Sequence, residues 1–392
     1  MTAGGGIRAD TQGTGAGGAV SVSAQNVVMT DAATINASST GAGNAGNIGI
    51  QTGALLVETG SSIITQTLGQ GAGGTVAITA DKADLSTAGL ISSSATGAGN
   101  AGNIAMTFTG DLLLSGGAAV AAETQGTGAG GAINLKANNL SLLDQGKITS
   151  SSAGSGRAGN INLDVGGDLT SSGGTISANT KLSGTGGAIS ISAQNIVMTG
   201  TASINASSTG TGLAGDITLK AGDTLKLRNS SITTEASVDA DGGNIIISVP
   251  NKISLTDSKI TSSVGGGPQT RGGNINIDPQ YVVMKNSQIV ANAFAGTGGN
   301  ITIVANTVLA DPQSSVDASS QLGISGSVDI QAPIKSVSGL VAPLSSDYVS
   351  ASALLKERCI ARIREGKYSS FVVGGRDGLP IEPGNMLPGF MQ

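Results

Sequence analysis

A repeat of about 28 residues constrains the fold of this chain more than any other feature. The segment GGAVSVSAQNVVMTDAATINAS at 17–38 returns with few changes as GGAISISAQNIVMTGTASINAS at 186–207. A fixed period of this size is typical of solenoids, in which each copy buries its apolar side chains against its neighbours. One apolar residue follows each glycine-rich segment, at intervals of 26 to 30 residues: Val20, Ile48, Val76, Ile104, Ile133, Ile161, Ile189, Ile217, Ile245, Ile275, Ile301 and Val328.

Each copy contains three short groups in which apolar residues alternate with polar ones. In one copy these groups are Ile189 with Ile191, Ile196 with Met198, and Ile204 alone. Alternation with a period of two is typical of β-strands. Strands this short cannot form a sheet within one copy, so we expect each to pair with the same strand of the next copy. The repeat therefore predicts an all-β fold, a single-stranded parallel β-helix of about twelve coils with three parallel sheets.

The two faces of these strands carry different kinds of side chain. Positions expected to face inward carry Val, Ile, Leu and Met, and outward positions carry Ser, Thr, Asn and Ala. The turns alternate between a TQGTGAGGA type and a GNAGNI type, which gives a second period of 56 residues. Asp216, Asn244, Asn274 and Asn300 share one repeat position. We expect stacked coils to align these side chains in a hydrogen-bonded ladder.

The stretch TGAGNAGNI at 40–48 contains Gly41, Gly43 and Gly46 at the spacing of a dinucleotide fingerprint, and it returns at 96–104. A dinucleotide-binding turn needs a helix after it, whose N-terminus holds the pyrophosphate. Here a strand pattern follows instead. We therefore interpret these glycines as corners of the solenoid, where positive φ and close passage of successive backbones favour glycine.

The composition narrows the possible functions. The formal net charge is −5, and no basic face of the kind that binds nucleic acid is visible. The chain has no histidine, no tryptophan and only seven aromatic residues in all, so His-based acid/base chemistry is absent. A single cysteine excludes an internal disulfide. We expect no enzyme activity, no cofactor, and no catalytic, cofactor-binding or metal-ligating residues.

The acidic residues offer two alternatives to that expectation. Glu58, Asp84 and Asp111 occupy similar phases of successive copies, so they could lie on neighbouring coils. Paired carboxylates could make the protein a polysaccharide lyase or hydrolase, and solvated surface acids would explain the same residues. Asp239 and Asp241 form one isolated acidic turn and no calcium-binding nonapeptide series. We predict a structural turn there.

The sequence changes character near residue 331. We expect the β-helix over 1–331 and a C-terminal capping region over 332–392. An amphipathic helix is predicted there, with Leu355, Cys359 and Ile363 on one apolar stripe and a mostly basic opposite face. We expect this helix to cap the last coil and Cys359 to be a small buried thiol. Solvation explains the basic face, and docking onto an acidic partner or a membrane surface remains an alternative.

The repeats with the pattern GNIxI, and the tail CIARIREGKYSSFVVGGRDGLPIEPGNML at 359–387, resemble the filamentous-haemagglutinin-like exoproteins of bacterial two-partner secretion. The resemblance implies a right-handed β-helix that is exported through a dedicated outer-membrane transporter. It also implies an adhesive role, secreted or at the bacterial cell surface, toward glycans or proteins of host or neighbouring cells. Asp377 departs from the family pattern, where a glycine follows Gly-Arg. Because a signal peptide and a secretion domain are typical of the family, we expect this chain to be a C-terminal part.

Overall fold

A computed structural model describes residues 1–237 and 239–337 of the chain. The described part is a β-solenoid in which strands of successive coils pair in parallel. This confirms the predicted all-β parallel β-helix of about twelve coils.

The strands of the described residues form two sheets. The twelve-strand sheet, which takes the third strand of each repeat, consists of β1 (Gly6–Arg8), β3 (Thr34–Asn36), β5 (Ser62–Thr67), β7 (Leu90–Ala95), β10 (Ala119–Ala121), β13 (Lys147–Thr149), β16 (Thr175–Ser177), β18 (Ser203–Asn205), β20 (Ser231–Thr233), β23 (Lys259–Thr261), β26 (Gln288–Val290) and β29 (Ser315–Asp317).

The nineteen-strand sheet contains the first two strands of each repeat. Its members are β2 (Val20–Met29), β4 (Ile48–Val57), β6 (Val76–Leu85), β8 (Ile104–Phe108), β9 (Leu112–Leu114), β11 (Ile133–Ala137), β12 (Leu140–Leu143), β14 (Ile161–Val165), β15 (Asp168–Ser172), β17 (Ile189–Thr199), β19 (Ile217–Arg228), β21 (Ile245–Ser248), β22 (Lys252–Thr256), β24 (Ile275–Asp278), β25 (Tyr281–Lys285), β27 (Ile301–Val304), β28 (Thr307–Ala310), β30 (Val328–Gln331) and β31 (Ile334–Val337).

The expectation of three separate sheets is wrong. In β2, β4, β6, β17 and β19 the first and second strand groups join into one strand of 10 to 12 residues. The backbone bends there without ending the ladder, and the register between β17 and β19 shifts between Ala193 and Asn195. A local irregularity of this kind lets one sheet turn a corner, so two faces of the cross-section share a sheet.

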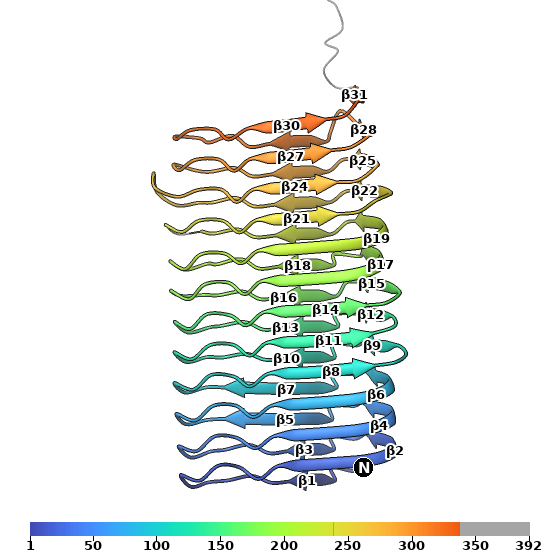
Figure 1. Ribbon diagram of the computed structural model, residues 1–392. Coiled ribbons are helices and arrows are strands. Elements are labelled where there is room, and N and C mark those ends of the chain that lie inside the picture. The colour runs from blue at the N-terminus through green and yellow to red at the C-terminus, as the bar shows by residue number, and fades with distance from the viewer. Residues whose placement is uncertain (238, 338–392) are drawn as a thin grey trace, which may run out of the picture. The chain divides into compact units, whose positions relative to one another are not determined.

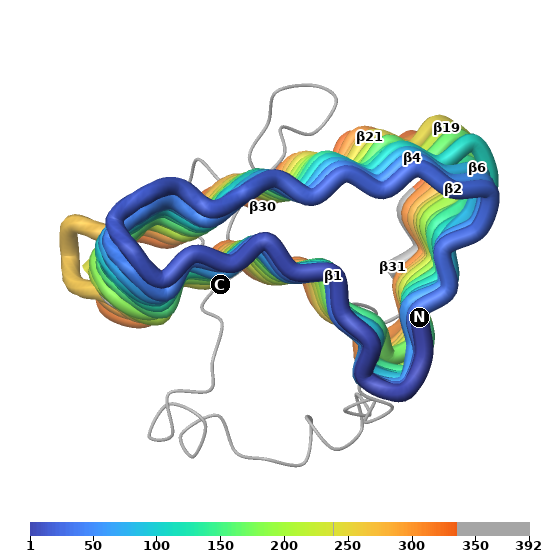
Figure 2. The backbone as a smooth tube through the Cα atoms, turned by 90° about the horizontal axis from the view of Figure 1, so that it is seen from below, coloured from blue at the N-terminus to red at the C-terminus, as the bar shows by residue number. Residues whose placement is uncertain are grey.

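The solenoid is right-handed, as the family resemblance implies. In Figure 1 the strands nearest the viewer run to the right while the chain rises from its N-terminal coil, and the strands behind them run to the left. Seen along the axis, successive coils superpose closely over most of the cross-section (Figure 2). Each repeat position therefore becomes a column that runs the length of the rod.

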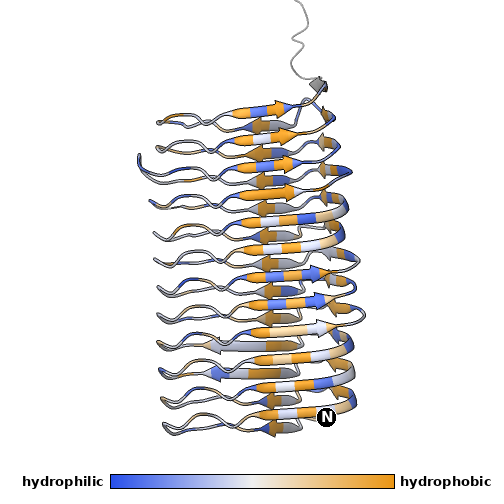
Figure 3. Ribbon diagram, viewed as in Figure 1, coloured by the Kyte–Doolittle hydropathy of each residue, from blue (hydrophilic) through white to orange (hydrophobic). Residues whose placement is uncertain are grey.

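The core consists of columns of like residues. Ile133, Ile161, Ile189 and Ile217 are register partners on successive coils, and all are buried. Figure 3 shows apolar residues alternating with more polar ones along the front strands. The predicted inward and outward assignment is thus confirmed. Each fully buried Ile or Leu stabilises the fold by roughly 1.5–3 kcal/mol.

The glycine-rich segments form a narrow lobe, at the left of Figure 2, between the twelve-strand and nineteen-strand sheets. A Cβ added to Gly41, Gly43 or Gly46 would overlap a backbone carbonyl oxygen of the preceding coil. None of the three has a positive φ. The need for glycine is confirmed, and its cause here is the close passage of successive backbones. Positive φ, the other predicted cause, does not apply in this lobe.

Positive φ occurs instead at the corner where the nineteen-strand sheet leads into the twelve-strand sheet. Asp31, Asp144, Asn229, Asp257 and Asn286 all have φ between 46° and 56°. Asn and Asp tolerate this left-handed conformation better than other residues with a Cβ. We call this corner the turn column.

The predicted C-terminal helix, with Leu355, Cys359 and Ile363, lies outside the described residues. The stacked strands run as far as β31, which pairs with β28. In the part of the chain that the structure describes, no helix is long and apolar enough to cross a membrane.

Candidate functional site

The three carboxylates singled out as an acid/base candidate fall in different columns. Asp84 pairs with Leu56 and Leu113 in the strand register. Glu58 follows β4 at the turn, and its backbone amide donates to the Met29 carbonyl oxygen. Successive coils therefore do not bring the three carboxylates into one aligned cluster.

Asp84 and Asp111 do line one shallow hollow of about 470 Å³, beside Leu56 and Leu113. Asp84 Oδ1 is buried there without a hydrogen-bond partner. Asp111 belongs to a surface ladder, in which its Oδ1 accepts from Asn139 Nδ2 at 2.8 Å. The ladder continues over the following coils through Asp168, Asn195 and Thr224. Each of these residues donates a hydrogen bond to a side-chain oxygen on the preceding coil. Coil-to-coil stabilisation accounts for Asp111.

The acidic turn near residue 240 is structural, as predicted. Asp239 Oδ1 accepts from the Gly267 amide at 2.7 Å, and Asp241 Oδ1 accepts from the Arg271 amide at 2.8 Å. Both carboxylates thus bind the backbone of the next coil. Among residues 1–237 and 239–337, no three metal-ligating acidic or thiol side chains come together.

The predicted polar ladder is confirmed. The Asn244 amide donates to Asp216 Oδ1 at 2.7 Å, and the Asn274 amide donates to Asn244 Oδ1 at 3.0 Å. Asn300 continues the column, since its amide donates to Asn274 Oδ1 at 2.9 Å. The same bond explains the asparagines of the glycine motif, where Asn47 Oδ1 accepts from the Thr75 amide at 2.8 Å.

The outward side of the twelve-strand sheet is recessed, and sequence reasoning missed it. Side chains that face outward from this sheet are mostly half-buried. Ser92, Ser177 and Thr261 are only 8%, 7% and 1% exposed, although the neighbouring isoleucines occupy the core side. Outward residues of the first strand group in the nineteen-strand sheet, such as Lys136 and Ser192, are exposed, whereas those of its second group, such as Val197 and Ser254, are half-buried. We call the outward side of the twelve-strand sheet the recessed face.

Two projections flank the recessed face. Figure 2 shows the short strip that contains β1 set back between the glycine lobe on one side and the turn column on the other. Both projections recur on nearly every coil, so the recess continues along the rod. In the sequence, the recess was indicated only by the two turns that flank the third strand of each repeat. The direction in which these turns project cannot be read from periodicity.

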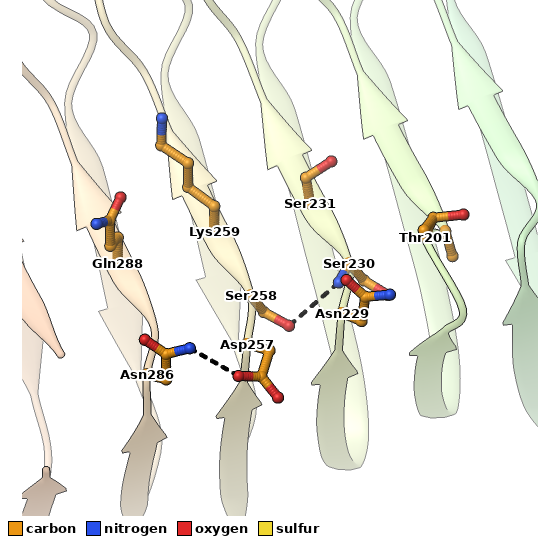
Figure 4. A pocket seen from close by; sticks show the side chains of 10 residues that line it. Thr201, Asn229, Ser230, Ser231, Asp257, Ser258, Lys259, Asn286 and Gln288 are labelled. Atoms are coloured by element: carbon orange, nitrogen blue, oxygen red, sulfur yellow. Dashed lines mark hydrogen bonds between the residues drawn. The ribbon is translucent and has the colours of Figure 1, made fainter. Parts of the chain in front are cut away.

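A hollow of about 410 Å³ lies where the recessed face meets the turn column, over β20, β23 and β26 (Figure 4). Ser231, Lys259 and Gln288 contribute side chains from successive strands. The turn column contributes Asn229, Asp257 and Asn286, and Asn286 Nδ2 donates to Asp257 Oδ1 at 2.8 Å.

A ladder of serines supports this wall from beneath. The Ser230 amide donates to Ser258 Oγ at 3.3 Å, and the Ser258 amide donates to Ser287 Oγ at 3.1 Å. Ser287 continues the pattern by donating its amide to Ser314 Oγ at 3.1 Å. Because each hydroxyl fixes the backbone of the coil before it, the polar groups above are held on a rigid frame.

The groups that line the hollow are of the kinds that bind a polar ligand. It presents hydroxyl, amide, ammonium and carboxylate groups, and Asp257 is the one carboxylate among its lining residues. General acid/base catalysis on a glycosidic bond needs two carboxyl groups on opposite sides of that bond. A mixture of donors and acceptors on a rigid open surface suits a polyhydroxylated ligand.

No protein-family model matches the chain, and no curated protein or solved structure matches it either.

Proposed function

We propose that this protein is a secreted or cell-surface adhesive rod, a filamentous-haemagglutinin-like exoprotein of a two-partner secretion system. The observation that carries the proposal is the recessed polar face, which repeats the same kind of surface coil after coil. Contacts that are weak one at a time add strongly when many act on one ligand or one surface. A rigid solenoid fixes their spacing, so little entropy is lost when several engage together.

The polar side chains of the rod support a structural role and not a catalytic one. The polar ladders that run between coils use side-chain amides, hydroxyls and carboxylates to stabilise the stack. A polysaccharide lyase or hydrolase is the alternative, and Asp84 and Asp111, which share a hollow, are its candidate carboxylates. Asp111 is engaged in the surface ladder through Asn139. The adhesive proposal accounts for more of the molecule.

Export and adhesion can be tested together. The full-length protein is expressed in its native host, and cell fractions are probed before and after protease treatment of intact cells. We expect protease-sensitive protein at the surface or in the medium, and its loss when the cognate outer-membrane transporter is deleted. Beads coated with the full chain should then stay on cell or biofilm surfaces under flow. Recovery of the protein only from the cytoplasm would contradict the proposal.

The enzymatic alternative has a direct assay. The full chain is incubated with a panel of acidic and neutral glycans, and new reducing ends and unsaturated products are measured. We expect neither. Product formation that disappears in Asp84→Asn would replace the adhesive proposal with the enzymatic one.

A further inference from the structure

The outward column nearest the glycine lobe has a regular pattern on the recessed face. Its members are register partners on successive coils: Asp10, Ser38, Gln66, Ser94, Glu123, Ser151, Asn179, Ser207, Glu235, Ser263, Asn292 and Ser319. Serine occupies every second coil, and a carboxylate or carboxamide occupies the coils between. We call this the alternating column. It repeats every two coils, or roughly 9.6 Å at about 4.8 Å between strands.

The long side chains of the alternating column also alternate in charge. Asp10, Glu123 and Glu235 are carboxylates, and Gln66, Asn179 and Asn292 are amides that separate them. On the opposite side of the same face, Lys147 and Lys259 each lie one coil after a glutamate. The recessed face therefore offers both signs of charge in a regular order.

Apart from Asp10, these charged groups make no ion pair within the described residues. Within the described residues, the ion pairs are Arg8 with Asp10 and Lys136 with Asp164. Glu235 and Lys259 belong to neither. Two further polar atoms are buried without a partner, Thr261 Oγ1 on the coil of Lys259 and Asn292 Oδ1 on the next coil. Buried polar atoms without a hydrogen bond are uncommon in proteins and call for an explanation.

We propose that the recessed face binds one extended, uncharged linear polysaccharide along the rod axis, with one disaccharide for every two coils. This inference rests on the proposed adhesive function and identifies its ligand class. The two-coil repeat of the alternating column is close to the length over which an extended β-linked glycan repeats its outline. Glu235, Lys259, Thr261 and Asn292 mark one part of the face where charged groups without an ion pair lie near buried polar atoms without a partner.

The charge order selects for a neutral polymer. A polyanion running along the recessed face would meet a carboxylate at Glu123 and again at Glu235, and a polycation would meet Lys147 and Lys259. Like charges opposed at an interface discriminate strongly against a partner. Sugar hydroxyls accept hydrogen bonds from ammonium and amide groups and donate them to carboxylates, so they suit every group in the column.

The test uses the full chain and isothermal titration calorimetry with cello-oligosaccharides, lengthened by one disaccharide at a time. We expect the affinity to rise with each added disaccharide, by about threefold to tenfold. Oligosaccharides of alginate and of chitosan, as polyanion and polycation, should bind at least about tenfold more weakly than cello-oligosaccharides of equal length. Tighter binding of either charged polymer, or affinity that does not depend on length, would overturn the inference.

Two substitutions locate the site. Ser151→Gln and Ser263→Gln place long side chains where the alternating column has short ones, which removes the two-coil repeat. Together they should weaken binding of the longest oligosaccharide at least about tenfold. The matched control is Ser192→Gln on the exposed nineteen-strand sheet, which should leave binding unchanged. Circular dichroism and thermal unfolding show whether the variants keep the fold.

Equal binding by the double variant and by Ser192→Gln would place the ligand elsewhere and overturn the inference. The adhesion assay separates this result from failure of the proposed function. A chain that reaches the cell surface and retains beads under flow, yet binds no oligosaccharide, contradicts the ligand and leaves the adhesive role standing. A chain confined to the cytoplasm contradicts the adhesive role.

Discussion

The outward side of the first strand group in the nineteen-strand sheet and that of the twelve-strand sheet are built from similar residues and yet differ in access to solvent. Ser192 and Lys136 face outward from the nineteen-strand sheet and are exposed, whereas Ser177 and Thr261 face outward from the twelve-strand sheet and are buried. The strand pattern is the same in both. The difference comes from the segments that flank each sheet, because the glycine lobe and the turn column both project beside the short strands (Figure 2).

This contrast shows that an outward position on a solenoid is not always a solvated one. On the first strand group of the nineteen-strand sheet an outward polar side chain keeps its water, so its identity has little effect on stability. On the recessed face a polar side chain loses part of its hydration. A ligand that hydrogen-bonds to it there replaces that water and gains more binding free energy from the contact. The predictions below test the contrast, beginning with the largest expected effect.

Shortening a core residue should cost a similar free energy of unfolding beneath either sheet. Ile217 lies under the nineteen-strand sheet and Ile260 under the twelve-strand sheet, and both are fully buried. Each substitution to Ala should lower the free energy of unfolding by about 2–5 kcal/mol, because it removes buried methyl groups and leaves a cavity. Equilibrium denaturation measures the loss. Ser192→Ala is the control and should change stability by less than about 0.5 kcal/mol; equal, small losses at all three sites would contradict the assignment of faces.

The glycine lobe, as one side of the recess, should not accept a Cβ. A Cβ at Gly156 would overlap the carbonyl oxygen of Gly128 on the preceding coil, whereas one at Gly49 on the nineteen-strand sheet meets nothing within 4 Å. Gly156→Ala should therefore cost about 1–3 kcal/mol through overpacking. Thermal and chemical unfolding should show no such loss for Gly49→Ala. If Gly156→Ala is as stable as the parent, the lobe is looser than its close backbone contacts indicate.

The floor of the recess should tolerate loss of a hydroxyl. Thr261 Oγ1 is buried without a hydrogen-bond partner. Thr261→Val should stabilise the unliganded protein by up to about 1 kcal/mol, since an isosteric methyl removes the cost of burying that hydroxyl. On the exposed sheet, Thr79→Val should change the free energy of unfolding by less than about 0.5 kcal/mol. A clear destabilisation of Thr261→Val would mean that its hydroxyl has a partner.

The smallest effect concerns pH. Burial raises the pKa of Asp317, but hydrogen bonds from Asn292 Nδ2, the Ser319 amide and the Ser319 hydroxyl outweigh it and leave the pKa below its ordinary 3.8. A carboxyl with a lowered folded-state pKa contributes its stability above the unfolded-state value and loses it as pH falls through the folded-state value. We therefore expect stability to decline below about pH 4.

The variant Asp317→Asn isolates this effect. Its unfolding free energy should depend less on pH below about 4 than that of the parent chain. Asp311, whose pKa is also lowered, by the Ser314 hydroxyl above all, should behave in the same way when changed to Asn. Denaturation series at several pH values measure the slopes. Parallel slopes for Asp317→Asn and the parent would contradict the lowered pKa.

Much of the fold could be predicted because a solenoid repeats its local rules. The period of Ile189, Ile217 and Ile245 predicts which residues stack, and the register confirms it. The ladder from Asp216 to Asn300 followed from the same count of residues. The number of sheets did not follow, because a bend within a strand and a break between two strands leave the same apolar pattern.

The candidate site was harder to predict, because it depends on how two turns project. Asp84 and Asp111 looked like a pair by phase, but a difference of two positions places them in separate columns. Glu235, Lys259 and Thr261 carried no motif. They gain significance only from the recess, the unpartnered atoms and the regular order of charges.

The sequence by itself determined the coil, its parallel pairing and the residues that fill the core, because the period of 28 and the alternation of two are properties of a linear chain. The tertiary structure decided which outward positions are recessed, why the lobe needs glycine, and which carboxylates meet. Those properties depend on the path of the corners, and on distances between coils that no periodicity records.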